Sequence, residues 1–332
     1  MFKNEIKNYD IIASGMRPTG NIHIGNYNAV IKNWVSLQKH YKCFFFIADI
    51  HALTTNFKNI YNLKKNTKIM ITEWLASGLN PDKCVMFIQS HVPETLELHI
   101  FLSMLVNLTR LERIPSYKNE KNNTSSYGFL GYPVLQASDV LILNAHYVPV
   151  GEDQVPHIEF IRELARKINS DPIGKKKIFN EPQALLYKHT KVLGSDGQKM
   201  SKSKNNTVLI TDSSEILKNK INKYITDPNR IYRHQYGNPE NCTIWSLHKI
   251  YTSITEKNYI FTACKSANIG CVECKAQLFD NIEKQNNKLI RKIKLYEKKE
   301  KYINDLIEEG GKNARLIAKE TLLAFKLSYQ LI

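Results

Sequence analysis

Residues 10–27, DIIASGMRPTGNIHIGNY, decide the fold of this 332-residue chain. The apolar run that ends at Ser14 is typical of a buried strand, and Gly15 permits a tight turn directly after it. From Ile24 to Val35 the apolar residues recur at helical spacing. A helix that begins after such a turn aims free backbone N–H groups at the turn, where they attract anions. The segment therefore predicts a strand, an anion-binding turn and a helix.

Further apolar runs at residues 43–49, 84–88 and 147–150 also read as strands. Helical patterns accompany them at residues 24–39, 61–77, 94–107, 133–145 and 155–168. Strands that alternate with helices predict a parallel sheet covered by helices. Because the runs are continuous in apolar residues, we expect the sheet to be buried on both faces. The predicted fold class is α/β, with a Rossmann-like parallel sheet.

The rest of the chain departs from this alternation. Residues 94–130 are irregular, and their polar part, 118–128, reads as a loop. After about residue 215 the pattern is mainly helical. Gly310-Gly311 is expected to separate a basic segment from a final apolar helix over 314–331.

The charge of the chain is strongly positive and unevenly distributed. The chain has 47 Lys and Arg against 31 Asp and Glu, a net charge of +16. Residues 1–170 hold 18 of these basic and 14 of the acidic residues, while residues 171–332 hold 29 and 17. The excess predicts a polyanionic partner, first of all a nucleic acid. A solvated, Lys-rich surface is the alternative interpretation.

The composition also excludes some classes of protein. Hydrophobic residues make up 42% and charged residues 23%, as is typical of globular proteins. No apolar run is long enough to span a membrane, and residues 1–7 lack the apolar centre of a signal peptide. We therefore expect a cytoplasmic protein that has no membrane partner.

A second motif, Lys199-Met200-Ser201-Lys202-Ser203, follows a glycine-containing turn. Its two lysines are three residues apart and can reach one polyphosphate, although a Lys-rich surface loop is the alternative. Together with His23-Ile24-Gly25-Asn26, this motif resembles the two signature motifs of class I aminoacyl-tRNA synthetases. The resemblance implies that the first motif cradles ATP, with Gly25 under the adenine, and that the second holds the triphosphate.

The same resemblance implies which residues act on ATP. The implied catalytic residues are His23, Asn26, Lys118, Lys199 and Lys202. The implied ATP-binding residues are Arg17, Pro18, Thr19, Gly25, Asn26, Gly151, Asp153, Lys199, Met200, Ser201 and Lys202.

The segments YPVLQASDVL (132–141) and VPVGEDQ (148–154) resemble the tryptophanyl-tRNA synthetase family within that class. In that family the residue matching Asp139 accepts the indole N–H of the substrate. A carboxylate suits this role because the only polar group of the tryptophan side chain is a donor. With phenylalanine the buried carboxylate would be left unpaired, which disfavours that substrate. The implied tryptophan-binding residues are Arg17, His51, Tyr132, Gln136, Asp139 and Gln154.

The six cysteines fall into two groups. Cys43 and Cys84 lie in predicted strands and read as small core residues. The other four follow the spacing C-x21-C-x6-C-x2-C: Cys242, Cys264, Cys271 and Cys274. Four thiols suit zinc or an iron–sulfur cluster, and zinc sites more often use two C-x2-C pairs. The spacing resembles the [4Fe–4S] motif of a subset of tryptophanyl-tRNA synthetases; four reduced cysteines without a ligand are the remaining alternative.

The resemblance implies a tryptophan–tRNA ligase that uses ATP and Mg²⁺ and transfers tryptophan to tRNA(Trp). A tyrosyl-tRNA synthetase and a non-catalytic, RNA-binding iron–sulfur paralogue are the alternatives. The implied domains are a catalytic domain over 1–215, a helical anticodon-binding domain over 216–310, and a helix over 311–332 that packs back on the first. The resemblance also implies a homodimer with its interface near 94–130, and DNA is not an expected partner.

Overall fold

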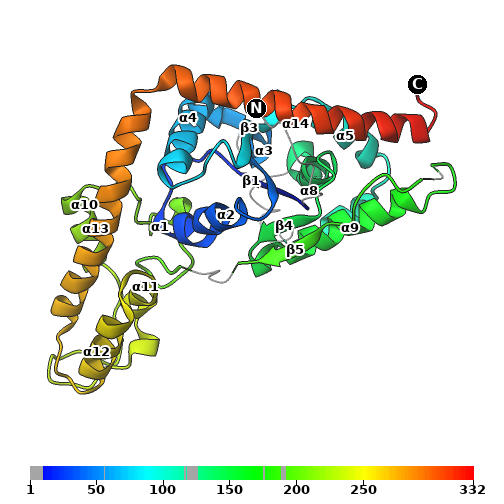
Figure 1. Cartoon of the computed structure of the whole chain (residues 1–332). Helices are drawn as coiled ribbons and strands as arrows, with labels where there is room; N and C mark the ends of the chain where they lie inside the picture. Colours follow the sequence, from blue (N-terminus) through cyan, green and yellow to red (C-terminus); the bar gives the residue numbers. More distant parts are fainter. Residues whose placement is uncertain (1–9, 56, 116, 118–125, 175, 188–191) are drawn as a thin grey trace.

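The computed structural model describes residues 10–55, 57–115, 117, 126–174, 176–187 and 192–332. Its centre is a five-stranded, wholly parallel sheet with the order β3-β2-β1-β4-β5 (Figure 1). The strands are β1 (Ile11–Met16), β2 (Lys42–Ile47), β3 (Cys84–Ile88), β4 (Tyr147–Val150) and β5 (Gln183–Leu186). The α/β prediction is confirmed, and the first four strands lie where the apolar runs predicted them. Strand β5 was not predicted: its residues are partly exposed, and its apolar run, Ala184-Leu185-Leu186, is only three residues long.

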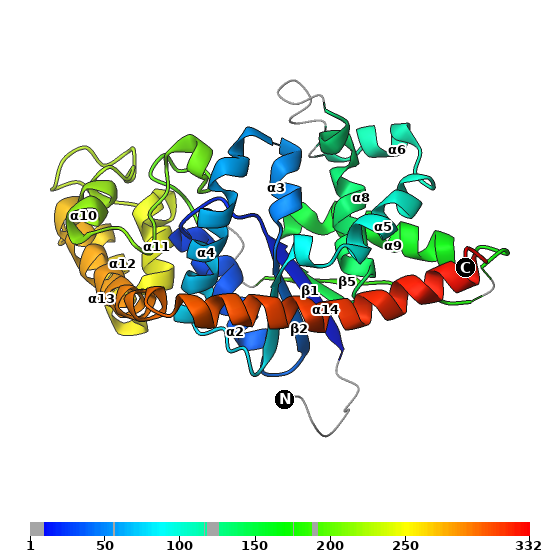
Figure 2. The same cartoon turned by 90° about the horizontal axis from the view of Figure 1, so that it is seen from above.

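Helices surround this sheet on both faces (Figures 1 and 2). Those of the first half are α1 (Ile24–Asn26), α2 (Lys32–Leu37), α3 (Asp49–Thr55), α4 (Ile60–Ala76), α5 (Glu94–Ser103), α6 (Leu108–Glu112), α8 (Tyr127–Leu141) and α9 (Val155–Asn169). Those of the second half are α10 (Ser214–Asn222), α11 (Thr243–Tyr251), α12 (Ile254–Lys265), α13 (Cys271–Glu297) and α14 (Glu300–Ser328). A π-helical stretch, Tyr27–Ile31, joins α1 to α2.

Successive residues of β2 pack into different halves of the core, as expected for a sheet buried on both faces. Phe45 lies in the half built with α2 and α4, where its ring stacks on Trp34 at a centroid distance of 4.4 Å. Phe44 lies in the other half, together with residues of α8, α9 and α14. The continuous apolar run of this strand is thus explained by burial of both of its faces.

The order of the strands alone predicts where a ligand site lies in the sheet. From β1 the chain moves outward through β2 to β3, and then returns to place β4 on the opposite side of β1. The connections that leave β1 and β4 therefore diverge, and a crevice opens at the carboxyl ends of these two strands. The turn at residues 17–23 follows β1 directly into this crevice.

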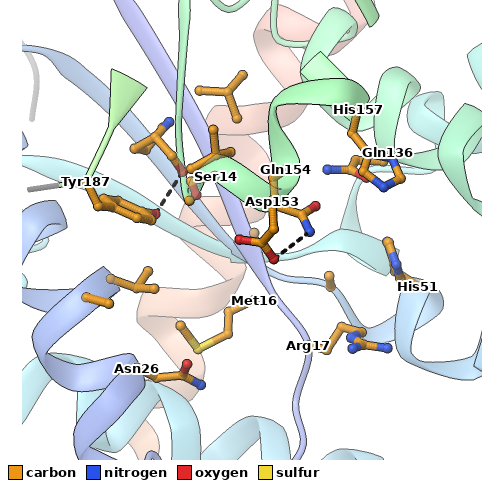
Figure 3. Close-up of a pocket in the computed structure, with 18 of the residues that line it drawn as sticks. Ser14, Met16, Arg17, Asn26, His51, Gln136, Asp153, Gln154, His157 and Tyr187 are labelled. Atoms are coloured by element: carbon orange, nitrogen blue, oxygen red, sulfur yellow. Dashed lines mark hydrogen bonds between the residues drawn. The ribbon is translucent and has the colours of Figure 1, made fainter. Parts of the chain in front are cut away.

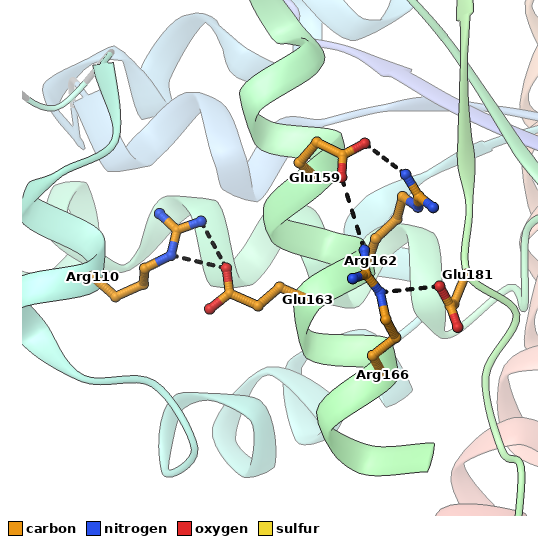
Figure 4. A network of polar contacts seen from close by, with 6 residues as sticks. All are labelled: Arg110, Glu159, Arg162, Glu163, Arg166 and Glu181. Atoms are coloured by element: carbon orange, nitrogen blue, oxygen red, sulfur yellow. Dashed lines mark hydrogen bonds and ion pairs between the residues drawn. The ribbon is translucent and has the colours of Figure 1, made fainter. Parts of the chain in front are cut away.

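Helix α9 carries polar contacts on its outer face (Figure 4). Arg110 of α6 donates to Glu163 at 2.7 and 2.9 Å, and Arg166 forms an ion pair with Glu181 at 3.0 Å. These pairs are half exposed, so each contributes at most about 1 kcal/mol. The buried apolar face of α9, which includes Ile158, Ile161 and Leu164, holds the helix in place more strongly.

Helix α14 corrects one prediction from the sequence. It runs without interruption through Gly310 and Gly311, where a break was expected, and it lies beside β3 as it crosses the sheet domain (Figure 1). A Cβ atom on Gly310 would overlap the carbonyl oxygen of Met86 in β3. Gly310 therefore allows the helix to lie directly against the backbone of a strand, while Gly311 faces the side chain of His91. None of the helices in the described residues is long and apolar enough to span a membrane.

We predict that Gly310→Ala lowers the free energy of unfolding by about 1–3 kcal/mol, because the added methyl group must push α14 away from β3. Urea denaturation followed by circular dichroism measures this change. Gly128→Ala is the matched control, since a Cβ there meets no atom closer than 4.0 Å and lies in the first turn of α8. Equal stabilities of the two variants would show that the close approach is unimportant.

Candidate active site

A cavity of about 500 Å³ occupies the crevice between β1 and β4 (Figure 3). The predicted site residues that line it are Arg17, His23, Gly25, Asn26, His51, Tyr132, Gln136, Asp139, Gly151, Asp153, Gln154, Lys199 and Met200. Four others lie outside this lining: Pro18, Thr19, Ser201 and Lys202. Lys118 lies outside the described residues. In Figure 3 Gln136, His157 and His51 gather at one side of the cavity, and Asn26 projects from the other.

His23 begins the helix after β1 and is buried. Its Nδ1 accepts a hydrogen bond from the backbone N–H of Asn26 at 3.2 Å. Burial, with the charges of Lys202 and Lys199, lowers the pKa of His23 to about 4, so the ring is neutral at pH 7. With Nδ1 accepting, the proton of the neutral ring lies on Nε2, which leaves an N–H to donate. A Cβ on Gly25 would lie 2.8 Å from Nδ1 of His23, so the imidazole itself covers this glycine.

The two lysines of the second motif each contact a different loop. Lys199 forms an ion pair with Asp153 at 3.0 Å, beside the end of β4. Lys202 donates to the backbone oxygen of Thr19 at 2.9 Å, in the turn after β1. Burial lowers the pKa of Lys202 to about 8. Met200, between the lysines, is buried in the core and anchors the motif.

Asn206 holds the loop of the second motif in shape, and sequence reasoning did not single it out. Its side chain accepts from the backbone N–H of Ser201 at 2.8 Å and donates to Asp196 at 2.8 Å. Further backbone contacts join this loop to the helical part: Ile225 N–H donates to the carbonyl of Ser195 at 3.1 Å. The position of the two lysines therefore depends on residues on both sides of the motif.

Glu73 of α4 is a second residue that sequence reasoning missed. It is 1% exposed, and its carboxylate accepts from the N–H of Ile22 and from the side chain of Asn21, both at 2.7 Å. Burial raises the pKa of Glu73 to about 7, while its hydrogen bonds and the charge of Lys202 act in the opposite direction. Glu73 stands among the apolar residues of a helix that covers the sheet, and this position could have drawn attention to it in the sequence.

Asp139 lies at the buried end of the cavity. Gln89 donates through one amide nitrogen to both carboxylate oxygens, at 2.7 and 2.8 Å. Burial raises the pKa of Asp139 well above its usual range, and the bonds from Gln89 act against that shift. Gln89, which the sequence did not single out, also accepts from the N–H of His51 at 3.0 Å. It therefore holds together two of the predicted tryptophan-binding residues.

His51 and Tyr132 form the wall beside Asp139. Their ring centroids are 5.3 Å apart, and the ring of Tyr132 also contacts that of His157 at 5.7 Å. Burial, together with the charge of Arg17, lowers the pKa of His51 to about 3. A neutral imidazole, an aromatic ring and a buried acceptor thus face the same part of the cavity.

The two ends of the cavity differ in chemistry, so the cavity can bind a flat apolar group at one end and a polyphosphate at the other. One end offers a buried acceptor among aromatic rings, which suits a flat apolar group with a single donor. The other end offers a neutral histidine, backbone N–H groups and two lysines, which suit a polyphosphate. Cations placed there stabilise the charge that develops when a phosphoryl group is transferred.

The four cysteines of the second half lie in one region, away from this cavity. Cys242 precedes α11, Cys264 is in the last turn of α12, and Cys271 and Cys274 are in the first turn of α13. Burial raises the pKa of Cys274 to about 12, and the other three thiols add to this shift. Within the described residues, however, no group of three or more His, Cys, Asp or Glu side chains is arranged to hold a metal ion.

Comparison with known proteins adds to this geometry. The family described as "tRNA synthetases class I (W and Y)" matches residues 7–285. The chain is 43% identical to the tryptophan–tRNA ligase of Thermotoga maritima over 318 residues, which cover 94% of this chain and 96% of that protein. It is 37% identical to the tryptophan–tRNA ligase of Aquifex aeolicus, with 94% and 97% covered.

Solved structures agree with these sequence matches. The tryptophanyl-tRNA synthetase of Campylobacter jejuni, solved with ADP and tryptophan, superposes with a TM-score of 0.85 at 32% identity. The match covers 96% of this chain and 98% of that one. The fold, the two signature motifs and these likenesses agree: the chain belongs to the class I tRNA synthetases of the W and Y family.

Proposed function

We propose that this chain is a tryptophan–tRNA ligase, which forms tryptophanyl-adenylate from tryptophan and ATP and transfers tryptophan to tRNA(Trp). The main support for this proposal is the buried pair of Asp139 and Gln89 at the closed end of the cavity. The carboxylate of Asp139 has about four acceptor sites, of which Gln89 occupies two, and it lines the cavity, so it can accept one further hydrogen bond. The indole N–H of tryptophan fits this acceptor.

In the first step the substrate carboxylate attacks the α-phosphorus of ATP, and pyrophosphate leaves. No protein nucleophile is needed, because the reactants need only alignment and neutralised charge. ATP enters as its Mg²⁺ complex. His23 donates from Nε2 to a phosphate oxygen, and Lys199 and Lys202 leave their present partners, Asp153 and Thr19, for the phosphates.

Tryptophan-dependent exchange of pyrophosphate into ATP tests this proposal. The purified chain, given tryptophan, ATP and labelled pyrophosphate, is expected to form labelled ATP without tRNA. Exchange with tyrosine in place of tryptophan would assign the chain to the tyrosine branch. No exchange with either amino acid would support a non-catalytic RNA-binding protein.

We predict that Glu73→Gln shifts the alkaline limb of kcat/KM for ATP to lower pH. The negative charge of Glu73 raises the pKa of Lys202, which is about 8, so its removal makes Lys202 lose its proton at lower pH. The fold should persist, because Gln can accept from Ile22 N–H while the amide of Asn21 turns to accept from it. Pyrophosphate exchange between pH 6 and 9.5 measures the limb. Glu309→Gln, at an exposed position of α14, is the control, and identical profiles for both variants would contradict the coupling.

We also propose that the four cysteines bind a [4Fe–4S] cluster. The support is four thiols whose charges act on one another, with Arg230 donating to the sulfur of Cys264 at 3.7 Å. A positive side chain suits thiolates, and the backbone of Trp245 and Ile244 acts to lower the pKa of the Cys242 thiol, against the larger effect of burial. Zinc sites of four cysteines more often use two C-x2-C pairs, whereas these four cysteines contain one such pair, Cys271 and Cys274. This makes zinc the weaker alternative.

Metal analysis of anaerobically purified protein tests the cluster. About four iron atoms and four sulfides per chain, with a brown colour, are expected. Cys271→Ser should lose most of the iron, while Cys43→Ser, in the sheet, should keep it. A colourless protein with one zinc would decide for zinc, and a metal-free protein that remains folded would decide for reduced cysteines.

The remaining parts of the proposal concern assembly. The catalytic unit over 1–215, the anticodon-binding unit over 216–310 and the C-terminal segment over 311–332 remain proposed domains, as do the homodimer and the cytoplasmic location. The net positive charge of residues 171–332 supports tRNA as the macromolecular partner. Sedimentation of the purified chain at micromolar concentration would show whether it is a dimer.

A further inference from the structure

Residues 231–236, called here the aromatic loop, expose large side chains close together. Ile231 is 76%, Tyr232 61% and Tyr236 78% exposed. The rings of Tyr232 and His234 are nearly parallel, with an interplanar angle of 6° and a centroid distance of 5.7 Å. Arg233, between them, is also exposed. Burial in the core does not account for any of these side chains.

The backbone of the aromatic loop is held from within. Arg230, 7% exposed, donates to the carbonyls of Arg233 and Ile269 at 2.9 and 2.8 Å. Gln235 accepts from the N–H groups of Ile231 and Tyr232, both at 2.8 Å. The loop is thus preorganised, so a ligand that binds its exposed rings pays little of the usual cost of ordering a loop.

The aromatic loop lies far from the cavity, so only a large partner can contact both. Gly237 donates from its N–H to the carbonyl of Cys264, and Arg233 forms an ion pair with Glu273 in the first turn of α13. Helix α13 has 27 residues, so it is about 40 Å long. Figure 1 shows α12 and the start of α13 at the end of the molecule that lies farthest from β4 and β5.

We propose that Tyr232, His234 and Tyr236 form a stacking surface for unpaired bases of tRNA; this rests on the proposed function. Unpaired RNA bases are recognised by stacking on aromatic and Arg side chains. Arg233 supplies a positive charge between the rings, in a half of the chain with 29 basic and 17 acidic residues. A bound tRNA can span the distance between this surface and the cavity, where its end is charged.

Two separate activities test the stacking surface. Pyrophosphate exchange needs no tRNA, so Tyr232→Ala and Tyr236→Ala should leave its kcat and KM unchanged. In aminoacylation each variant should raise the KM for tRNA about tenfold, since one stacked base is lost. Tyr232→Trp, which keeps a ring, should restore a KM near that of the wild type. The matched control is Tyr259→Ala on α12, where the side chain is 58% exposed and should not affect the KM.

The outcomes are distinguishable. An unchanged KM for tRNA in both alanine variants, with normal exchange, would overturn the stacking surface and leave the ligase intact. A rise in KM that Tyr259→Ala reproduces would also overturn it, because the effect would then follow from any exposed ring. If the wild-type chain lacks exchange altogether, the proposed function fails first. Thermal unfolding of each variant confirms that the helical part is folded.

Discussion

Lys202→Ala is expected to lower the kcat of tryptophan-dependent pyrophosphate exchange by about 100- to 1,000-fold. The ammonium group lies in the turn after β1, 2.9 Å from the carbonyl oxygen of Thr19. In the proposed complex ATP occupies that turn, and the same group reaches its phosphates. Charge builds up on them mainly in the transition state, so the loss should appear in kcat. The KM for tryptophan, whose proposed position is at the other end of the cavity, should change little.

Lys204→Ala provides the matched control for this experiment. It removes the same type of side chain from the same short helical turn, but Lys204 contacts Gln198, whereas Lys202 contacts Thr19 in the turn after β1. Exchange by this variant should stay within a few-fold of the wild type. A normal kcat in Lys202→Ala would refute the assigned role, and a raised KM for tryptophan would instead point to a disturbed fold.

Asp139→Asn is expected to lower kcat/KM for tryptophan by about 10- to 100-fold, while the change for phenylalanine is small. The amide has one acceptor oxygen, and Gln89 already donates to this position. The remaining NH₂ group would face the indole N–H, so two donors would meet without an acceptor. Phenylalanine has no donor and loses nothing comparable. The ratio of the two kcat/KM values in pyrophosphate exchange measures the effect.

The neighbouring Ser138→Ala serves as the control for Asp139→Asn. Ser138 is fully buried one position away on α8, and its hydroxyl donates to the carbonyl of Leu135 rather than to the cavity. Its variant should keep the discrimination of the wild type, whatever its stability. An equal loss for tryptophan and phenylalanine in Asp139→Asn would mean that the carboxylate shapes the site without reading the indole.

Most of the sheet and both signature motifs could be predicted from the sequence because their signals are local. Strand β3 lies where its apolar run predicted it, and the amphipathic pattern of α9 matches its buried face. Features that depend on distant contacts left no such signal. The helix through Gly310 is stabilised by its fit against Met86, which no local propensity reveals.

The candidate site shows the same difference between local sequence signals and features that depend on distant contacts. Most residues that line the cavity and were matched to motifs could be named from the sequence, whereas the residues that hold them in place could not. Gln89 and Glu73 are ordinary polar residues in the sequence, and their roles arise only when folding brings Asp139 and Asn21 to them. A buried polar residue becomes informative once its hydrogen-bond partner is known.

The crossing of α14 over β3 has a consequence for how the chain behaves in concentrated solution. A parallel sheet has two open edges, and an open edge can pair with the strands of another molecule. At one edge β5 is only four residues long. At the other, α14 lies on the backbone of β3, with Gly310 in contact with it. Helix α14 thus covers the edge strand β3 and prevents it from pairing with a strand of another molecule. A chain shortened before Glu300 should therefore aggregate.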